Sequence, residues 1–452
     1  MKKNIIVMAI LLCFCTAVSA QSTLKTGYFM DRMSMRHEFN PAFSNEQGYF
    51  AIPALGDINF GVNSTMSLDD FLFPLESGEL GLFAHPDVDQ SAFLSNLNQD
   101  NLINQDLSLS ILSLGFHGFG GYNTFDVSVR ENFGINIQKS LFEFMVGAND
   151  NGVYDMSGTS IDLTSWIETS IGHSHRINEN ITAGIKLKYL IGAANASLTV
   201  DQMQFESSEE QVMVGFHTTG TVAAAGMQLN GSFSDLAFDT FDFASVSNSG
   251  FAVDLGATYE MDDFTFALAL TDLGFIRWSA PSTVSMGAET TFTGFNDLDL
   301  NDFSGSTEDQ LEELMDPFTD LGDSMELTST DAYSTWLAAN LNMSAQYDIF
   351  DCLSVGAIYT ATFSSVTTHE LMGVVTYTPA KWFSIALSGT TSTYGTYWGW
   401  ALNYSPHYFL NFFVGSDCMV TKVTPQFIPY SSTNLNLKFG LSIPFGHRHT
   451  AN

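Results

Sequence analysis

The sequence predicts an all-β protein, a transmembrane antiparallel β-barrel of about 14 strands, and three observations carry this prediction. An apolar leader that ends in small residues marks the chain for export. Along most of the remaining chain, apolar residues alternate with small polar ones, which is the period of a strand with one apolar and one wet face. The alternating stretches run for about ten residues, the length of a tilted membrane-spanning strand.

The N-terminus has the pattern of an export signal. Lys2 and Lys3 precede the apolar run from Ile5 to Val18, and Ser19 and Ala20 complete a small-residue cleavage site. The run is shorter than the roughly 20 apolar residues of a membrane-spanning helix. We therefore expect residues 1–20 to be a cleaved signal peptide and the mature chain to reside in the outer membrane of a Gram-negative cell.

The composition restricts the partners. The chain has 15 Lys and Arg against 49 Asp and Glu, a net charge of −34. This disfavours a nucleic-acid partner, because phosphate binding needs a basic patch. Only 14% of the residues are charged, against about 25% in soluble domains. Outer-membrane lipid is the expected environment. Solvated acidic outer loops and the capture of cations are both open explanations of the acidity.

The segment 21–48 lacks the two-residue period and is not predicted to be a wall strand. It is locally basic, with Arg32, Arg36 and His37. Two placements are open, inside the lumen or as a loose periplasmic tail. If it lies in the lumen, Arg36 is expected to pair with Asp254 or Asp272, since a lowered dielectric strengthens such a pair.

Residues 49–446 are predicted to form the barrel, followed by a polar tail at 447–452. In the stretch 181–191, Leu187 belongs to the apolar face, and Lys186 belongs to the wet one. Charged wet-face residues are the candidates for the lumen lining: Lys186, Lys188, Asp254, Asp272 and Asp348.

Short turns at 178–180, 261–263, 348–351, 378–381 and 405–407 alternate with long connections, so both termini are expected in the periplasm. The region 193–248 is either one long outer excursion or an extra strand pair that raises the count to 16. The predicted strands are 57–64, 107–117, 122–137, 167–176, 181–192, 249–260, 264–274, 335–347, 353–364, 369–377, 383–391, 396–404, 409–416 and 434–445.

No catalytic residue, cofactor site or metal site is predicted. His173 and His175 share a strand face without a third ligand nearby. In the acidic loop 295–331, Ser306 to Asp309 resembles a capping box that starts a short helix ended by Pro317. Its spacing does not match a calcium-binding loop. Cys352 and Cys418 are expected to be free, because they lie at opposite ends of the wall.

Several stretches resemble an uncharacterised outer-membrane family common in Bacteroidota, whose broader kin are FadL-like channels and PorV or PorP/SprF-like barrels. The resemblance lies in RHEFNPAF at 36–43, GFAVDLGATY at 250–259, LALTDLGFIRW at 268–278, and SDCMVTKVTPQFIPY followed by NLKFGLSIPFG. It implies a barrel of about 14 strands whose N-terminal segment enters the lumen as a hatch. The hatch would contain Arg36, Asn40, Pro41 and Ala42.

Two functions remain open. The first is a passive channel for small or hydrophobic solutes, because a barrel of this strand number is wider than its own side chains can fill. FadL-like relatives pass hydrophobic compounds through an opening in the wall. The second is a non-transport component that binds proteins of a secretion or surface-assembly machinery, as PorV-like relatives do. This alternative predicts a plugged lumen and ordered outer loops. An enzyme is not predicted, since no nucleophile arrangement is present.

Overall fold

The computed structural model describes residues 24–74, 80–83, 88–146, 153–207, 212–224, 227–228, 237–238, 248–279, 282–292, 326–364, 366–406, 410–419 and 434–446. The predicted signal peptide, the helix expected at 306–317, most of the acidic loop and the polar tail lie outside these residues.

None of the helices among the described residues is long and apolar enough to span a membrane.

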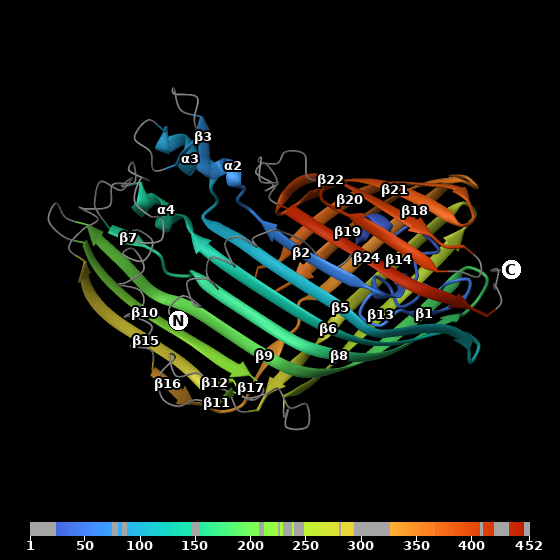
Figure 1. The fold of residues 1–452 in the computed structure, drawn as a ribbon, viewed down its shortest axis with the longest axis horizontal. Coiled ribbons are helices and arrows are strands. Elements are labelled where there is room, and N and C mark those ends of the chain that lie inside the picture. The colour runs from blue at the N-terminus through green and yellow to red at the C-terminus, as the bar shows by residue number, and fades with distance from the viewer. Residues whose placement is uncertain are drawn as a thin grey trace.

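The fold is a closed antiparallel β-barrel of 14 strands (Figure 1). The ring closes because β1 and β2 both lie between β24 and β5, end to end as one wall strand. This confirms the predicted fold class. The wall consists of β1 (Gly48–Ala51) with β2 (Ile58–Ser64), β5 (Asp100–Gly118), β6 (Gly121–Gln138), β8 (Ser160–Arg176), β9 (Ile181–Ser207), β13 (Ser249–Met261), β14 (Phe264–Trp278), β17 (Tyr333–Trp336) with β18 (Ala339–Phe350), β19 (Leu353–Phe363), β20 (Thr368–Ala380), β21 (Phe383–Ser392), β22 (Gly395–Tyr404), β23 (Asn411–Ser416) and β24 (Asn434–Phe445).

The two ends of the barrel differ. One end carries the tight turns at 119–120, 177–180, 262–263 and 351–352, and we call it the short-turn end. The other, the long-loop end, carries the longer connections and the additional elements (Figure 1), together with the two-residue turn at 393–394 between β21 and β22. The start of β1 and the end of β24 pair at the short-turn end.

The extra strand pair expected as an alternative at 193–248 does not enter the ring. β9 pairs with β13 through residue 191, and from residue 194 onward it pairs with β10 (Val212–Ala224). β10 continues to β15 (Ser282–Phe292) and β16 (Glu326–Ser329), so the sheet forks at the long-loop end. The count is therefore 14 and the alternative of 16 is wrong, because β9 changes partner along its length.

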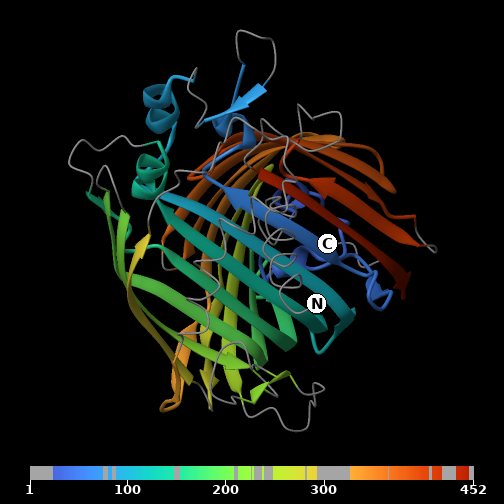
Figure 2. The same cartoon turned by 60° about the vertical axis from the view of Figure 1, so that its left-hand side comes forward.

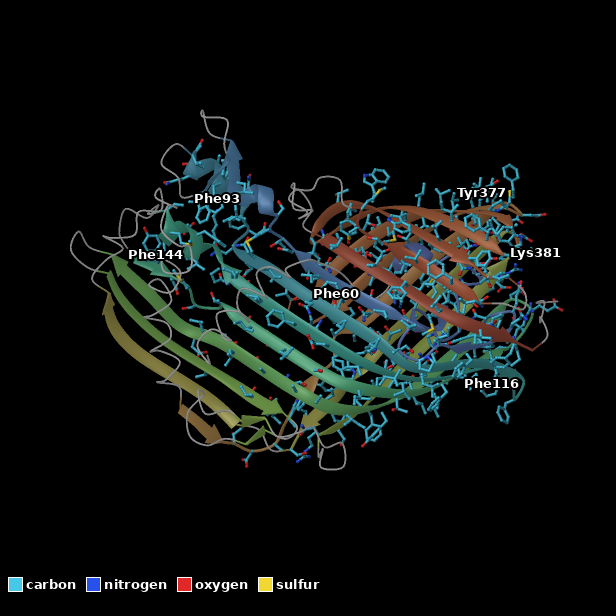
Figure 3. The ribbon with its side chains drawn as sticks, viewed as in Figure 1. Phe60, Phe93, Phe116, Phe144, Tyr377 and Lys381 are labelled. Carbon is cyan, nitrogen blue, oxygen red and sulfur yellow. The ribbon has the colours of Figure 1, made fainter. Side chains whose placement is uncertain are left out.

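Alternation sorts the wall residues between two faces. Leu187 is 51% exposed and points outward, whereas the neighbouring Lys186 is 2% exposed and points inward. Outward-facing large apolar residues include Leu255, Leu371 and Tyr377, the last near the short-turn end (Figure 3). This is the face assignment that the two-residue period predicts.

A small cap stands on the long-loop end, where the sequence predicts only long connections. It comprises α2 (Leu68–Phe71), β3 (Leu72–Pro74), β4 (Leu80–Leu82), α3 (Gln90–Asn96) and α4 (Lys139–Met145). Phe71, Phe83, Phe93 and Phe142 form its core, with Phe83 and Phe93 stacked at 4.4 Å. Side chains cap two of its three helices: Ser67 with Asp70 forms a capping box before α2, and Asp89 accepts from two N–H groups of α3. The short strand β7 (Val153–Asp155) lies beside α4, whereas β11 (Met227–Gln228) and β12 (Ala237–Phe238) pair with each other on the side of the molecule away from the cap (Figure 1).

Candidate functional site

The candidate site is the lumen, which the N-terminal segment enters. We call residues Leu24–Gln47 the plug. Figure 2 shows it inside the ring of strands. It folds as successive turns, with two short 3-10 helices, η1 (Lys25–Gly27) and η2 (Arg36–Glu38). Nearly all of its residues between Leu24 and Phe43 are buried. The structure therefore places the segment in the lumen and not in a loose tail.

One side of the lumen packs against the plug through apolar groups. Tyr28 lies at the centre of the aromatic group, with its ring centroid 4.9 Å from that of Phe29 and 5.4 Å from that of Phe39. Gly356 leaves room for Phe29, since a Cβ there would lie 2.6 Å from the ring. The wall residues of this core that lie between β19 and β23 are Ile358, Met372, Val374, Ala386, Ala401 and Phe413.

The turn at Asn40 and Pro41 sits in a recess of the wall. Gly184 on β9 pairs in register with Gly256 on β13. A Cβ at Gly184 would lie 2.1 Å from the carbonyl oxygen of Pro41, and one at Gly256 would lie 1.9 Å from Oδ1 of Asn40. The Asn40 amide donates to the carbonyl oxygens of β13 and β14 at 3.3 Å, and its Oδ1 accepts from the N–H of Ala42 at 2.8 Å. Two facing glycines thus hold this turn of the plug.

The opposite side of the lumen holds the plug with charges. Lys438 of β24 lies 2.7 Å from Glu38 of the plug and 2.8 Å from Asp57, and it is 1% exposed. Burial alone would raise the pKa of Glu38, but Lys438 and more distant basic groups lower it to about 2. Glu38 therefore contributes stability above the usual carboxyl pKa, and this contribution is lost as the pH falls toward 2.

A second charged contact joins the plug to β6. His37 lies 3.1 Å from Asp126 of β6, and Lys186 of β9 lies 3.1 Å from the same carboxylate. Ser113 of β5 donates to Asp126 at 2.6 Å. The predicted lumen residue Lys186 thus lies in the lumen beside the plug, with its charge matched by a wall carboxylate.

Three of the other predicted lumen residues, Lys188, Asp254 and Asp272, form a cluster of their own in the wall. Lys188 lies 2.8 Å from Asp254 and 2.6 Å from Asp272, and Glu168 is 3.7 Å away. The N–H of Asp272 donates to Asp254 at 2.7 Å. Arg130 of β6 approaches Glu168 at 3.3 Å.

The expected pairing of Arg36 with Asp254 or Asp272 is wrong. Arg36 pairs with Asp31 at 2.8 Å, donates to the Tyr28 carbonyl oxygen at 3.0 Å and lies over the Phe43 ring. The reason is that Lys188 on the adjacent strand already matches both wall carboxylates. The Arg36 guanidinium instead stabilises the turns of the plug itself.

The long-loop end of the plug is held by two wall carboxylates. Asp417 accepts from the backbone N–H groups of Lys25 at 2.9 Å and Thr26 at 2.7 Å. The Lys25 ammonium lies 2.9 Å from Glu370, which also accepts from the Tyr397 hydroxyl at 2.7 Å. We call this contact the latch. Sequence reasoning missed it, although a carboxylate at an inward position of β20 was a usable signal for Glu370.

Asp348 does not lie within the lumen. It is exposed at the short-turn end, where its N–H donates to the Asp263 carbonyl oxygen and its carboxylate accepts from Gln346. Asp348 keeps the side of the strand that Ser344 and Gln346 share, and Ser344 contacts Tyr28 of the plug. Its position near the end of β18 therefore places it at the rim of the lumen and not deeper inside.

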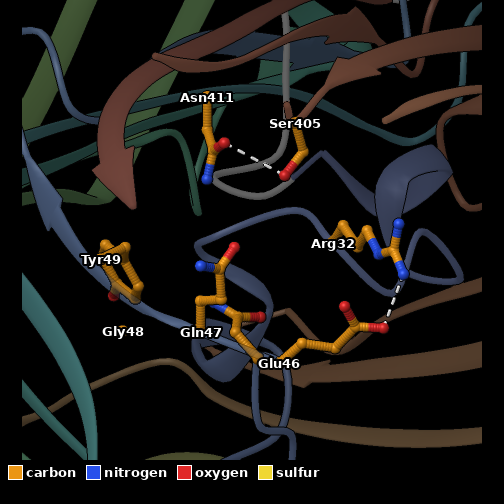
Figure 4. Close-up of a pocket in the computed structure, with 8 residues that line it drawn as sticks. Arg32, Glu46, Gln47, Gly48, Tyr49, Ser405 and Asn411 are labelled. Atoms are coloured by element: carbon orange, nitrogen blue, oxygen red, sulfur yellow. Dashed lines mark hydrogen bonds and ion pairs between the residues drawn. The ribbon is translucent and has the colours of Figure 1, made fainter. Parts of the chain in front are cut away.

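The mouth at the short-turn end contains a small recess beside the ion pair of Arg32 and Glu46, 2.6 Å apart (Figure 4).

Cys352 and Cys418 are both free. The Nδ1 atom of His173 lies 2.9 Å from Oδ1 of Asn123, and the His173 ring stacks on that of His175. Among the described residues, no cluster of His, Cys, Asp and Glu is arranged to hold a metal ion.

Residues 41–417 match the model of a family described as a family of unknown function, DUF5723. The chain belongs to this family. None of the curated protein sequences matches the chain.

Among solved structures, the chain is similar to the toluene transporter TbuX of Ralstonia pickettii, with 9% identity, 92% of this chain and 94% of that chain covered, and a TM-score of 0.40. A FadL homologue of Pseudomonas aeruginosa shares 11% identity, with 96% and 100% covered and a TM-score of 0.46.

Proposed function

We propose that this protein is an outer-membrane barrel that acts as a passive channel for small or hydrophobic solutes, with the plug as its gate. In this proposal the short-turn end faces the periplasm and the long-loop end faces outward. The apolar outer face, with Leu187 and Leu255 about half exposed, suits contact with lipid. The apolar outer face and the apolar N-terminal leader both support a location in a bacterial outer membrane.

The observation that carries the proposal is how the plug is attached. It continues covalently into the wall at Gly48, at the short-turn end, and its opposite end is held by the non-covalent latch. On the long-loop side of the plug, the wall lining is polar and partly exposed at Asn104, Asp106 and Asn132. We infer a vestibule open to the outside and a gate that releases at the latch.

A lumenal apolar cluster supports the hydrophobic part of the solute range. Trp166, Leu190, Ile276 and Trp278 gather on the inward faces of β8, β9 and β14 beside the fork. Apolar side chains with a few placed polar groups are the usual lining of small-molecule sites.

A disulfide lock tests the gate. The Oγ atoms of Thr26 and Ser388 lie 2.7 Å apart, which suits a disulfide between these positions. In a background with Cys352→Ser and Cys418→Ser, Thr26→Cys with Ser388→Cys should slow solute uptake into liposomes when oxidised, and reductant should restore it. The single variant Thr26→Cys is the control. Deleting 21–39 should raise uptake, and equal uptake in all these forms would reject a gated channel.

A second candidate function has its own observation. The phenylalanine core of the cap gives the long-loop end an ordered, outward-standing element. Together with a filled lumen, this suits a PorV-like or PorP/SprF-like component that binds exported proteins. Replacing residues 68–97 by a short Gly/Ser linker separates the two functions. If the protein is a channel, the linker variant keeps its solute uptake. If it is an assembly component, the linker variant loses surface attachment of exported proteins, and none of the plug variants changes solute uptake.

A further inference from the structure

We propose that the latch is a binding site for small organic cations with N–H donors, such as primary ammonium or guanidinium groups, and that such a cation releases the plug. This inference rests on the proposed function, because it names what moves the gate. In the present structure, the Lys25 side chain and the adjoining backbone N–H groups occupy the site.

The receptor half of the latch belongs to the wall. Glu370 on β20 and Asp417 after β23 are 4% and 3% exposed. Wall groups orient both carboxylates, since Tyr397 donates to Glu370 at 2.7 Å and the Asn436 amide donates to Asp417 at 3.2 Å. The carboxylates are therefore held in place by the wall itself. The plug presents a positive charge and additional N–H donors to these carboxylates. A small organic cation with N–H groups has the same chemistry.

An unused hydrogen-bonding group lies beside these carboxylates. Thr390 of β21 is 2% exposed, and its Oγ1 has no hydrogen-bond partner among the described residues. It pairs in register with Tyr397 on β22 and Met372 on β20, on the same inward side as Ser388. A buried hydroxyl without a partner costs free energy. A ligand with several N–H donors has a further acceptor here that the plug leaves unused.

The position of the latch suits a ligand that arrives from outside. Glu370 and Tyr397 each lie two residues after the start of their strands, next to the connections of the long-loop end, and Asp417 directly follows β23. A solute from the vestibule therefore meets the latch before the rest of the plug. The net charge of −34 raises the local concentration of cations around the protein.

The electrostatics give the cation its effect. If the plug leaves alone, Glu370 loses the Lys25 ammonium, and the carboxylate remains buried, which is strongly unfavourable. A cation that binds the vacated site restores this pairing and so favours the released state. A ligand shifts such an equilibrium only by its difference in affinity between the two states. Neutral and anionic solutes have no such preference for the vacated carboxylates.

Thiol labelling of the full-length protein tests this inference. The reporter is Ser34→Cys, a plug position that is 3% exposed, in the Cys352→Ser, Cys418→Ser background. Ethylammonium and millimolar guanidinium should accelerate labelling roughly tenfold, as for a typical coupling between sites. Tetramethylammonium, which has the charge without N–H donors, and potassium at equal ionic strength should not.

Two variants locate the effect. Glu370→Gln should abolish the response to ethylammonium, whereas Glu46→Gln, which removes a plug carboxylate at the other mouth, should preserve it. Equal acceleration by all salts, or a response that survives Glu370→Gln, would overturn the cation site. If Lys25→Ala opens the plug but ethylammonium does not, the gate stands and the cation site fails. If ethylammonium accelerates labelling without any solute uptake, the site stands and the channel fails.

Discussion

The two sides of the lumen hold the same plug by different physics. Between β19 and β23 the wall offers Ile358, Met372, Val374 and small residues to the aromatic and methionine side chains of the plug. From β24 through β9 it offers charges, with Lys438 opposite Glu38 and Asp126 opposite His37. Burial of apolar surface is non-directional, so the first side tolerates small displacements. Buried ion pairs lose most of their attraction when either partner moves away, so the second side sets the register of the plug.

This difference indicates where the resistance to plug movement lies. Sliding along the apolar side exchanges one apolar contact for another. Leaving the charged side breaks the contacts of Glu38 with Lys438 and of His37 with Asp126, and no apolar contact replaces them. We therefore expect the charged side and the latch to hold the plug closed. The apolar side contributes to the affinity between plug and wall but does not fix the position of the plug.

The largest effect is expected from Lys438→Met on the charged side. It leaves Glu38 and Asp57 buried without their shared cation. Removing one partner of a buried pair costs about 3–5 kcal/mol, measurable by urea unfolding in micelles. Lys381→Met, at an exposed turn, is the matched control and should be neutral. Similar stability of the two variants would mean that the charged side does not hold the plug.

On the apolar side, Met372→Ala should destabilise by about 2–4 kcal/mol, because it removes a fully buried side chain and leaves a cavity. The neighbouring Leu371→Ala changes an outward residue that is 53% exposed. The same unfolding measurement should show a much smaller loss for it. A larger loss from Leu371→Ala would contradict the assignment of the two faces.

The glycine recess provides a sharper comparison. Gly256→Ala places a Cβ against Asn40 and should cost about 1–3 kcal/mol, as overpacking does. Gly373→Ala has nothing within 4 Å of the added Cβ, so it should leave stability nearly unchanged. Labelling of Ser34→Cys should rise with Gly256→Ala alone. Unchanged labelling would show that the recess does not hold the plug.

The smallest effect is expected at the mouth, where Arg32 and Glu46 form a partly exposed pair. Glu46→Gln should cost less than about 1 kcal/mol, because solvent screens such pairs. The loss should shrink further at high salt, which screens exposed charges. A cost as large as that of Lys438→Met would remove the distinction between buried and exposed plug contacts.

The strands of the wall were predictable because their signal is local. Alternation alone assigns Leu187 outward and Lys186 inward, and each strand carries this information independently of its neighbours. Predictions failed where local signals end. β9 was expected to stop at residue 192 but runs to Ser207, since its continuation pairs with β8 and with β10, the next strand of the chain. Asp348 follows the alternation, yet it is exposed because it lies near the end of β18, at the mouth of the barrel.

The sequence by itself determined the barrel and its two faces, because each strand carries a two-residue period, but it left the strand number open between 14 and 16. It also marked residues 21–48 as something other than wall. Only the tertiary structure decided the partners inside the lumen. Register across strands far apart in sequence placed Lys188 between Asp254 and Asp272, and left Arg36 to pair with Asp31. The same register set Gly184 opposite Gly256 beneath Asn40 and brought Glu370 and Asp417 to the end of the plug. These contacts are long-range, so no local pattern specifies them.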